Sequence, residues 1–182
     1  MKVRNFGFSL IEVMAVTILV GIGSSVALVQ MKTSLASIDA DAASNLVMSQ
    51  LRYARQIAVD QRRSVLVEFT GSSTIVVTRQ DGGGVTTVLS TVTLPPGFTY
   101  GLPTWPADTP EGFGNANPVY FNAQTSGTFL ADGIFVNVGN IVVNGTVFTI
   151  GSGNATARAV TLTGASGRLK AYYLKANVWV DR

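Results

Sequence analysis

Residues 6–25 of the chain read FGFSLIEVMAVTILVGIGSS, and this stretch decides how the rest of the protein is organised. From Phe8 to Val29 the sequence contains no Lys, Arg, Asp, Asn, Gln or Pro. At about 1.5 Å per residue, a helix of this length spans about 33 Å, which is enough to cross a bilayer. The pattern therefore predicts a transmembrane helix over residues 8–29.

One carboxylate, Glu12, interrupts this apolar run near its start. A carboxylate in hydrocarbon costs at least about 2.5 kcal/mol, so such a side chain persists where a partner compensates its charge. If the chain is cut after Gly7, the new amine on Phe8 can pair with Glu12 of a neighbouring subunit in a stack of helices. The alternative is an ordinary membrane anchor, in which Glu12 reaches the lipid headgroups close to the end of the span.

The order of these features resembles the processing site of type IV prepilins and type II secretion pseudopilins. A short basic leader is followed by GFSLIE at residues 7–12 and then by the long apolar run. The resemblance implies cleavage after Gly7 by a prepilin peptidase, methylation of the new N-terminal Phe8, and a role for Glu12 in filament assembly. It also implies a single-pass protein of the bacterial inner membrane that joins other pilins or pseudopilins in a hetero-oligomeric fibre. The basic leader predicts a cytoplasmic N-terminus and a head outside the cytoplasm.

The helix is expected to continue to about residue 61, since no Gly or Pro occurs from Ser24 to Arg63. Its second part, residues 30–63, is predicted to be amphipathic and to lay one face on a sheet. The apolar stripe of that face consists of Leu35, Ile38, Ala42, Leu46, Val47, Leu51, Ala54, Ile57 and Ala58. The charged residues largely off this stripe are Asp39, Asp41, Arg52, Arg55 and Asp60.

After Arg63 the hydrophobic period changes from 3.6 to 2, which predicts a β-rich head over residues 64–182. Strands are expected at 64–70, 73–80, 85–94, 119–122, 133–138, 155–163 and 168–180. The Asn144-Gly145 pair is expected to turn a hairpin between residues 141–143 and 146–150. All six prolines fall in 95–118, which is predicted to be a long loop. The predicted class is α+β with a pilin-like fold: a leader peptide at 1–7, then a long helix packed on an antiparallel head.

The segment LRYARQIAV at residues 51–59, with a closing Gly-Arg-x-basic strand, resembles the GspH/FimT group of minor pseudopilins and minor pilins. Leu51, Ala54, Arg55 and Ala58 match the pattern of that group. The resemblance implies a structural subunit that initiates, caps or decorates a type II secretion pseudopilus or a type IV pilus. An exoprotein is then a candidate partner in protein secretion.

The last predicted hairpin has a defined register if residues 164–167 form its loop. Leu162 then lies opposite Leu169, and Val160 lies opposite Ala171. The residues that alternate with Leu169 and Ala171 are therefore expected on the other face of the strand.

Arg168, Lys170 and Tyr172 occupy that other face and are expected to share one exposed strip. In part of the FimT group a Gly-Arg-x-Arg motif on this strand is tied to DNA binding during uptake. The sequence at 167–170, GRLK, is similar, with Lys170 where arginine is expected. A lysine does not make the same planar bidentate contacts with phosphate. A DNA-binding minor pilin is thus the alternative function, and a solvated edge strand is the structural alternative.

The composition argues against an enzyme. The chain has no His and no Cys, which removes the commonest general base, the commonest metal ligand and every thiolate. The formal net charge of +3 is too small to indicate a class of partner. Asp108 and Glu111 form the only close acid pair in the long loop. We expect this pair to be solvated or to bind a cation adventitiously rather than to act in catalysis, and we expect no cofactor and no metal site.

Overall fold

The computed structural model describes residues 9–104, 108–114 and 116–182, without the side chains of 25–29 and 32–33. The chain divides into two compact units, Met1–Leu35 and Ala36–Arg182. The first element is helix α1 (Leu10–Gln61), which has 52 residues and confirms the continuous helix predicted from the sequence. The helix ends at Gln61 without a proline. Arg62, the next residue, has a φ of 51° and turns the chain toward the first strand.

In the first unit, the apolar side chains of α1 are exposed on every side of the helix. Between Leu10 and Ile22 the large apolar side chains are 53–79% exposed. These positions are too closely spaced to form a single stripe, so the helix is apolar all round. Among the residues that the structure describes, however, no helix meets both the length and the apolarity that a membrane crossing requires.

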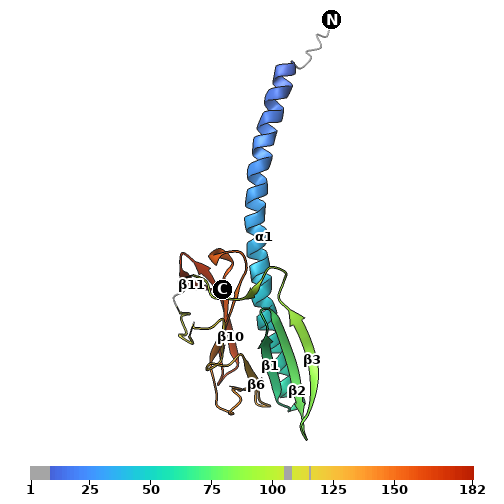
Figure 1. Cartoon of the computed structure of the whole chain (residues 1–182), viewed down its shortest axis with the longest axis vertical. Helices are drawn as coiled ribbons and strands as arrows, with labels where there is room; N and C mark the ends of the chain where they lie inside the picture. The colour runs from blue at the N-terminus through green and yellow to red at the C-terminus, as the bar shows by residue number, and fades with distance from the viewer. Residues whose placement is uncertain (1–8, 105–107, 115) are drawn as a thin grey trace, which may run out of the picture. The chain divides into compact units, whose positions relative to one another are not determined.

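The second unit contains a five-stranded antiparallel sheet in the order β3-β2-β1-β6-β7 (Figure 1). Its strands are β1 (Val65–Thr70), β2 (Thr74–Asp81), β3 (Val85–Thr93), β6 (Ser126–Phe129) and β7 (Phe135–Val136). The meander of β1, β2 and β3 confirms the first three predicted strands. Strand β6 was not predicted, because its short sequence SGTF has no apolar alternation to mark it.

The same unit contains a six-stranded antiparallel sheet in the order β11-β10-β9-β8-β4, with β5 also paired to β8. Its strands are β4 (Thr99–Tyr100), β5 (Val119–Tyr120), β8 (Gly145–Ile150), β9 (Arg158–Thr163), β10 (Arg168–Lys175) and β11 (Val178–Asp181). A 3-10 helix, η1 (Asn154–Thr156), precedes β9. One long helix with two antiparallel sheets confirms the α+β class.

One hydrophobic cluster joins α1 to strands of both sheets. The fully or nearly fully buried positions of the helix are Ala40, Ala43, Ser44, Val47, Leu51, Ala54 and Ala58. The predicted stripe is therefore correct from Leu46 onward, and wrong before it because Leu35, Ile38 and Ala42 are exposed. The small side chains of Ala40 and Ala43 let the helix approach the sheets closely, so size rather than hydrophobicity selects the buried face there.

One predicted turn is wrong, and one turn was not predicted. Neither Asn144 nor Gly145 has a positive φ, which the hairpin turn expected there requires at both positions. Gly145 instead begins β8, where an added Cβ would lie 2.1 Å from the Phe121 ring. The turn that was not predicted is Ala176-Asn177, where φ is 48° and 62°. It splits the predicted strand 168–180 into β10 and β11. Asparagine tolerates this conformation but alanine rarely adopts it, so Ala-Asn is only a weak signal for the turn.

Candidate functional site

The predicted processing site, Gly7 and Phe8, lies outside the described residues. Glu12 lies in the first turn of α1 and is exposed. Its N–H donates to the carbonyl oxygen of Ser9 at 3.1 Å and lies 3.3 Å from the Ser9 Oγ, so Ser9 caps the helix. A carboxylate in the first turn is favourable to the helix dipole. The role of Glu12 in assembly stays a prediction.

The β9–β10 hairpin has the predicted register. Leu162 pairs with Leu169 and Val160 pairs with Ala171, as the loop at 164–167 requires. Gly167 closes the turn with a φ of 62°. The side chains of Arg168, Lys170 and Tyr172 therefore alternate with the core-facing side chains of β10, as predicted.

These three residues do not share an exposed strip, and this part of the prediction is wrong. Arg168 is exposed, but Tyr172 is only 1% exposed and belongs to a buried cluster with Phe148. Lys170 is half-buried, and its Nζ lies 2.8 Å from the Glu111 Oε1. Glu111 comes from the long loop, which folds over this face of β10. The alternation of side chains along a strand does not show whether a distant loop covers one of its faces.

Glu111, Lys170 and Tyr172 form one electrostatic group. The Tyr172 hydroxyl donates to Glu111, and the Lys170 Nζ lies 3.2 Å from the same hydroxyl. Burial raises the pKa of Glu111, but the hydrogen bonds from Lys170 and Tyr172 outweigh it and hold the pKa below its ordinary value. Its hydrogen bond to Glu111 raises the pKa of Lys170. At neutral pH the charge of Lys170 is therefore neutralised within the head.

The other acid of the predicted pair, Asp108, is also engaged by the chain itself. Its Oδ1 accepts from the Thr109 N–H at 2.7 Å, and its Oδ2 accepts from the Gly114 N–H at 3.2 Å. Both contacts hold the loop together. Within the described ranges, no group of three or more Asp or Glu side chains is arranged to hold a metal ion.

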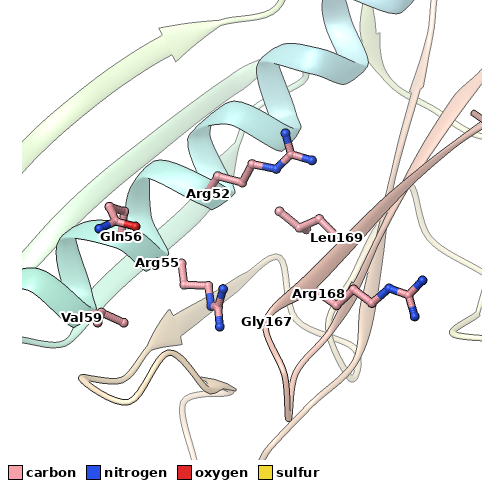
Figure 2. Close-up of a pocket in the computed structure, with 7 residues that line it drawn as sticks. All are labelled: Arg52, Arg55, Gln56, Val59, Gly167, Arg168 and Leu169. Atoms are coloured by element: carbon pink, nitrogen blue, oxygen red, sulfur yellow. The ribbon is translucent and has the colours of Figure 1, made fainter.

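A groove of about 520 Å³ lies between α1 and the β9–β10 turn, and we call it the arginine groove (Figure 2). Its lining consists of Arg52, Arg55, Gln56, Val59, Gly167, Arg168 and Leu169. Figure 2 shows Arg52 and Arg55 projecting from the helix toward the hairpin, while the Arg168 guanidinium extends away from the helix. The helix thus supplies the charges that face into the groove.

The position of Arg55 depends on the β9–β10 turn and on the segment before β7. The Arg55 Nε donates to the carbonyl oxygen of Gly133 at 3.2 Å. A Cβ added to Gly167 would lie 2.3 Å from that nitrogen and 2.8 Å from the Gly133 oxygen. Glycine at 167 is therefore required both for the positive φ and for the space that Arg55 occupies.

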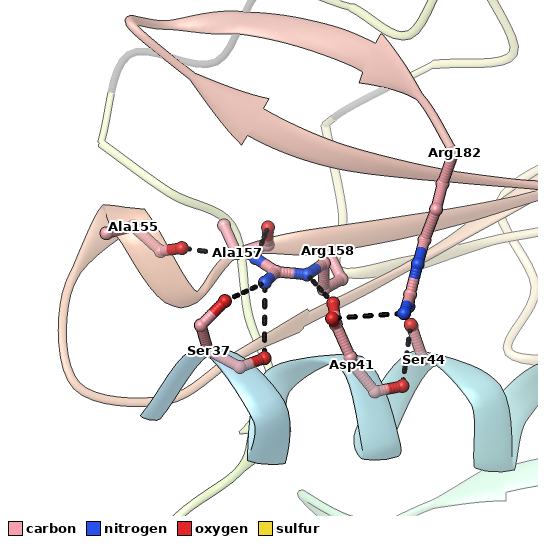
Figure 3. Close-up of polar contacts among 7 residues, drawn as sticks. All are labelled: Ser37, Asp41, Ser44, Ala155, Ala157, Arg158 and Arg182. Atoms are coloured by element: carbon pink, nitrogen blue, oxygen red, sulfur yellow. Dashed lines mark hydrogen bonds and ion pairs between the residues drawn. The ribbon is translucent and has the colours of Figure 1, made fainter. Parts of the chain in front are cut away.

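A second arginine site in the head has the opposite character. Arg158 is 4% exposed, and Figure 3 shows its guanidinium enclosed by acceptors. Its Nε donates to the Asp41 Oδ1 at 2.7 Å, and its Nη1 donates to the carbonyl oxygens of Ala155 and Ala157 at 3.1 and 3.0 Å. Its Nη2 donates to the Ser37 hydroxyl at 3.2 Å. Each guanidinium nitrogen of Arg158 is thus satisfied.

Asp41 receives a second cation, because the Arg182 Nη2 lies 3.1 Å from its Oδ2. The helix is in this way tied to β9 and to the residue after β11. The sequence analysis placed Asp41 largely off the packed stripe and predicted no partner for it. Arg158 within the buried strand segment ARAV was a signal that a carboxylate was needed, but the sequence did not show which one.

The comparisons with known proteins give few matches. No protein-family model and no curated protein matches this chain. Its structure is similar to two crystal structures of the type IV minor pilin FimU of Pseudomonas aeruginosa. The first is 18% identical, with a TM-score of 0.48 over 72% of this chain and 90% of that chain. The second is 16% identical, with a TM-score of 0.45 over 77% of this chain and 87% of that chain.

Proposed function

We propose that this chain is a minor pilin or minor pseudopilin, a subunit without enzymatic activity that assembles with other pilins in a fibre. The observation that carries this proposal is the first part of α1, where apolar side chains are exposed on every side. A single chain has no means of burying that surface, so the helix needs like helices or lipid around it. Glu12, exposed among these residues, then needs a cationic partner.

The steps before assembly are those that the resemblance to prepilins and pseudopilins implies. Residues 8–29 hold the chain in the bacterial inner membrane, and residues 64–182 form a head outside the cytoplasm. A prepilin peptidase removes residues 1–7, and the new N-terminal Phe8 is methylated. The Phe8 amine then pairs with Glu12 of a neighbouring subunit in a low-dielectric helix bundle. The head initiates, caps or decorates a type IV pilus or a type II secretion pseudopilus.

The proposal is tested by expressing the full chain with and without a prepilin peptidase. Intact mass and N-terminal sequencing should show a product that starts at methylated Phe8 only when the peptidase is present. Glu12→Ala should be processed but absent from the sheared fibre fraction, while Ser24→Ala, a control in the same exposed helix, should assemble. A chain that still begins at Met1, or a Glu12→Ala variant that assembles normally, would refute the proposal.

Contact with DNA through Arg168, Lys170 and Tyr172 stays a prediction and ranks second. Tyr172 is buried and Lys170 is paired with Glu111, so Arg168 is the one exposed side chain of the three. One guanidinium neutralises one phosphate, which gives only weak binding to a nucleic acid. The fibre role is therefore preferred.

A further inference from the structure

We propose that the arginine groove binds the carboxylates of an acidic segment on a neighbouring protein subunit. This inference deepens the proposed function, because it names the chemistry by which the head contacts another subunit of the fibre. It concerns only the head unit, Ala36–Arg182.

The charges of the groove lack carboxylate partners. Elsewhere in the head, Arg79, Arg158 and Arg182 each lie within 3.1 Å of an aspartate oxygen. In the part of the chain that the structure describes, no ion pair involves Arg52, Arg55 or Arg168. A guanidinium presents parallel N–H groups that match the two oxygens of a carboxylate. The groove is therefore charged to receive an anion from outside the chain.

The two helix arginines are also placed to act together. Arg52 and Arg55 are three residues apart, so they lie on the same face of α1. The bond from Arg55 to Gly133 holds one of them in position before a ligand arrives. Such preorganisation lowers the entropic cost of binding.

The remaining lining favours a polypeptide over a nucleic acid. Val59 and Leu169 place apolar surface beside the guanidinium groups, which suits a segment that carries both acidic and apolar side chains. Binding of single-stranded nucleic acid relies on aromatic side chains on which bases stack, and none of the described lining residues is aromatic.

The test uses the full chain in nonionic detergent, with a fluorescent oligoglutamate peptide and an oligothymidylate of equal charge as probes. Fluorescence anisotropy at low ionic strength should show tighter binding of the peptide. The double variant Arg52→Gln and Arg55→Gln should weaken peptide binding at least about tenfold. The matched control, Arg62→Gln and Arg63→Gln, removes the same charge from the end of the helix and should change binding less than about twofold.

Three outcomes would overturn the inference: no peptide binding at low ionic strength, equal weakening by both pairs, or tighter binding of the oligothymidylate. Thermal unfolding of each variant establishes that the head is still folded. The processing and fibre assays on the same preparations separate the two proposals. A chain that is cut after Gly7 and assembles, but whose peptide binding ignores Arg52 and Arg55, refutes this inference alone. A chain that is neither cut nor assembled refutes the proposed function, whatever the groove binds.

Discussion

Arg158 and Arg55 lie in the same head and differ in what neutralises them. Arg158 is buried and bonded to Asp41 and to three further residues. Arg55 is half-buried, donates to one carbonyl oxygen and has no ion pair among the described residues. The difference teaches that a charge satisfied inside the head serves stability, whereas a charge left open at a groove is available for recognition.

The largest expected effect comes from breaking the satisfied site. Asp41→Ala leaves the buried Arg158 guanidinium without its carboxylate, which should lower the free energy of unfolding by about 3 kcal/mol. For a chain of this size the melting temperature should fall by about 6–12 °C, measured by circular dichroism.

Asp39→Ala is the matched control, because it removes an exposed carboxylate two residues away on the same helix. Its effect should stay within about 0.5 kcal/mol. Equal destabilisation by the two variants would mean that the Arg158 network contributes no stability beyond an ordinary surface charge.

A smaller effect is expected where the turn supports the groove. Gly167→Ala combines a positive φ with a contact to the Gly133 oxygen, and should cost about 1–3 kcal/mol in a urea titration. It should also weaken binding of the oligoglutamate peptide, because the new methyl group displaces Arg55. Gly71→Ala, with a similar φ of 60° and no atom near the added carbon, isolates the backbone strain. If the two alanines cost the same and both leave peptide binding unchanged, Gly167 does not position Arg55.

The groove arginines themselves should matter little for stability. Arg52→Gln with Arg55→Gln removes the hydrogen bond from Arg55 to a backbone oxygen and the weak one from Arg52 to the Met48 sulfur. The free energy of unfolding should therefore fall by no more than about 1.5 kcal/mol. The same urea titration provides the comparison with Asp41→Ala. A loss as large as that of Asp41→Ala would show that Arg55 is a structural residue like Arg158, and the contrast between the two sites would disappear.

Local pattern predicted a large part of this fold. The helix, the first three strands and the register of the β9–β10 hairpin follow from periodicity and from loop length, which are properties of neighbouring residues. The failures share a cause. The exposed Leu35 and the paired Asp41 depend on what approaches the helix from the sheets, and a 3.6-residue period does not contain that information.

The candidate site was predicted only in part, because it also depends on contacts between distant segments. Arg168 was singled out correctly as an exposed cation, but its expected companions on the strand are covered by the loop that carries Glu111. Its actual companions, Arg52 and Arg55, come from the helix more than a hundred residues earlier, where the sequence suggested only a solvated face. Contacts between distant segments decided the site, and they became visible only in the folded structure.

The partly buried Glu111–Lys170 pair lies between the buried Arg158 site and the open arginine groove in character. Breaking this pair should change the stability of the head least. The pKa of Glu111 is lowered in the folded state, so its contribution is present above the ordinary value of about 4.3 and is lost as the pH falls through the lowered one. Glu111→Gln should therefore make the free energy of unfolding depend less steeply on pH below about pH 4.3, which is the acid limb of the stability curve. At neutral pH it should change the free energy of unfolding by less than about 1 kcal/mol, because the pair is partly solvated. Asp39→Asn, which removes one exposed carboxylate, is the control with which the acid limb of Glu111→Gln is compared. An acid limb that Glu111→Gln does not alter would mean that Lys170 is not held by this carboxylate in solution. Lys170 would then join Arg168 as a free cation, and the DNA-binding prediction would regain its second residue.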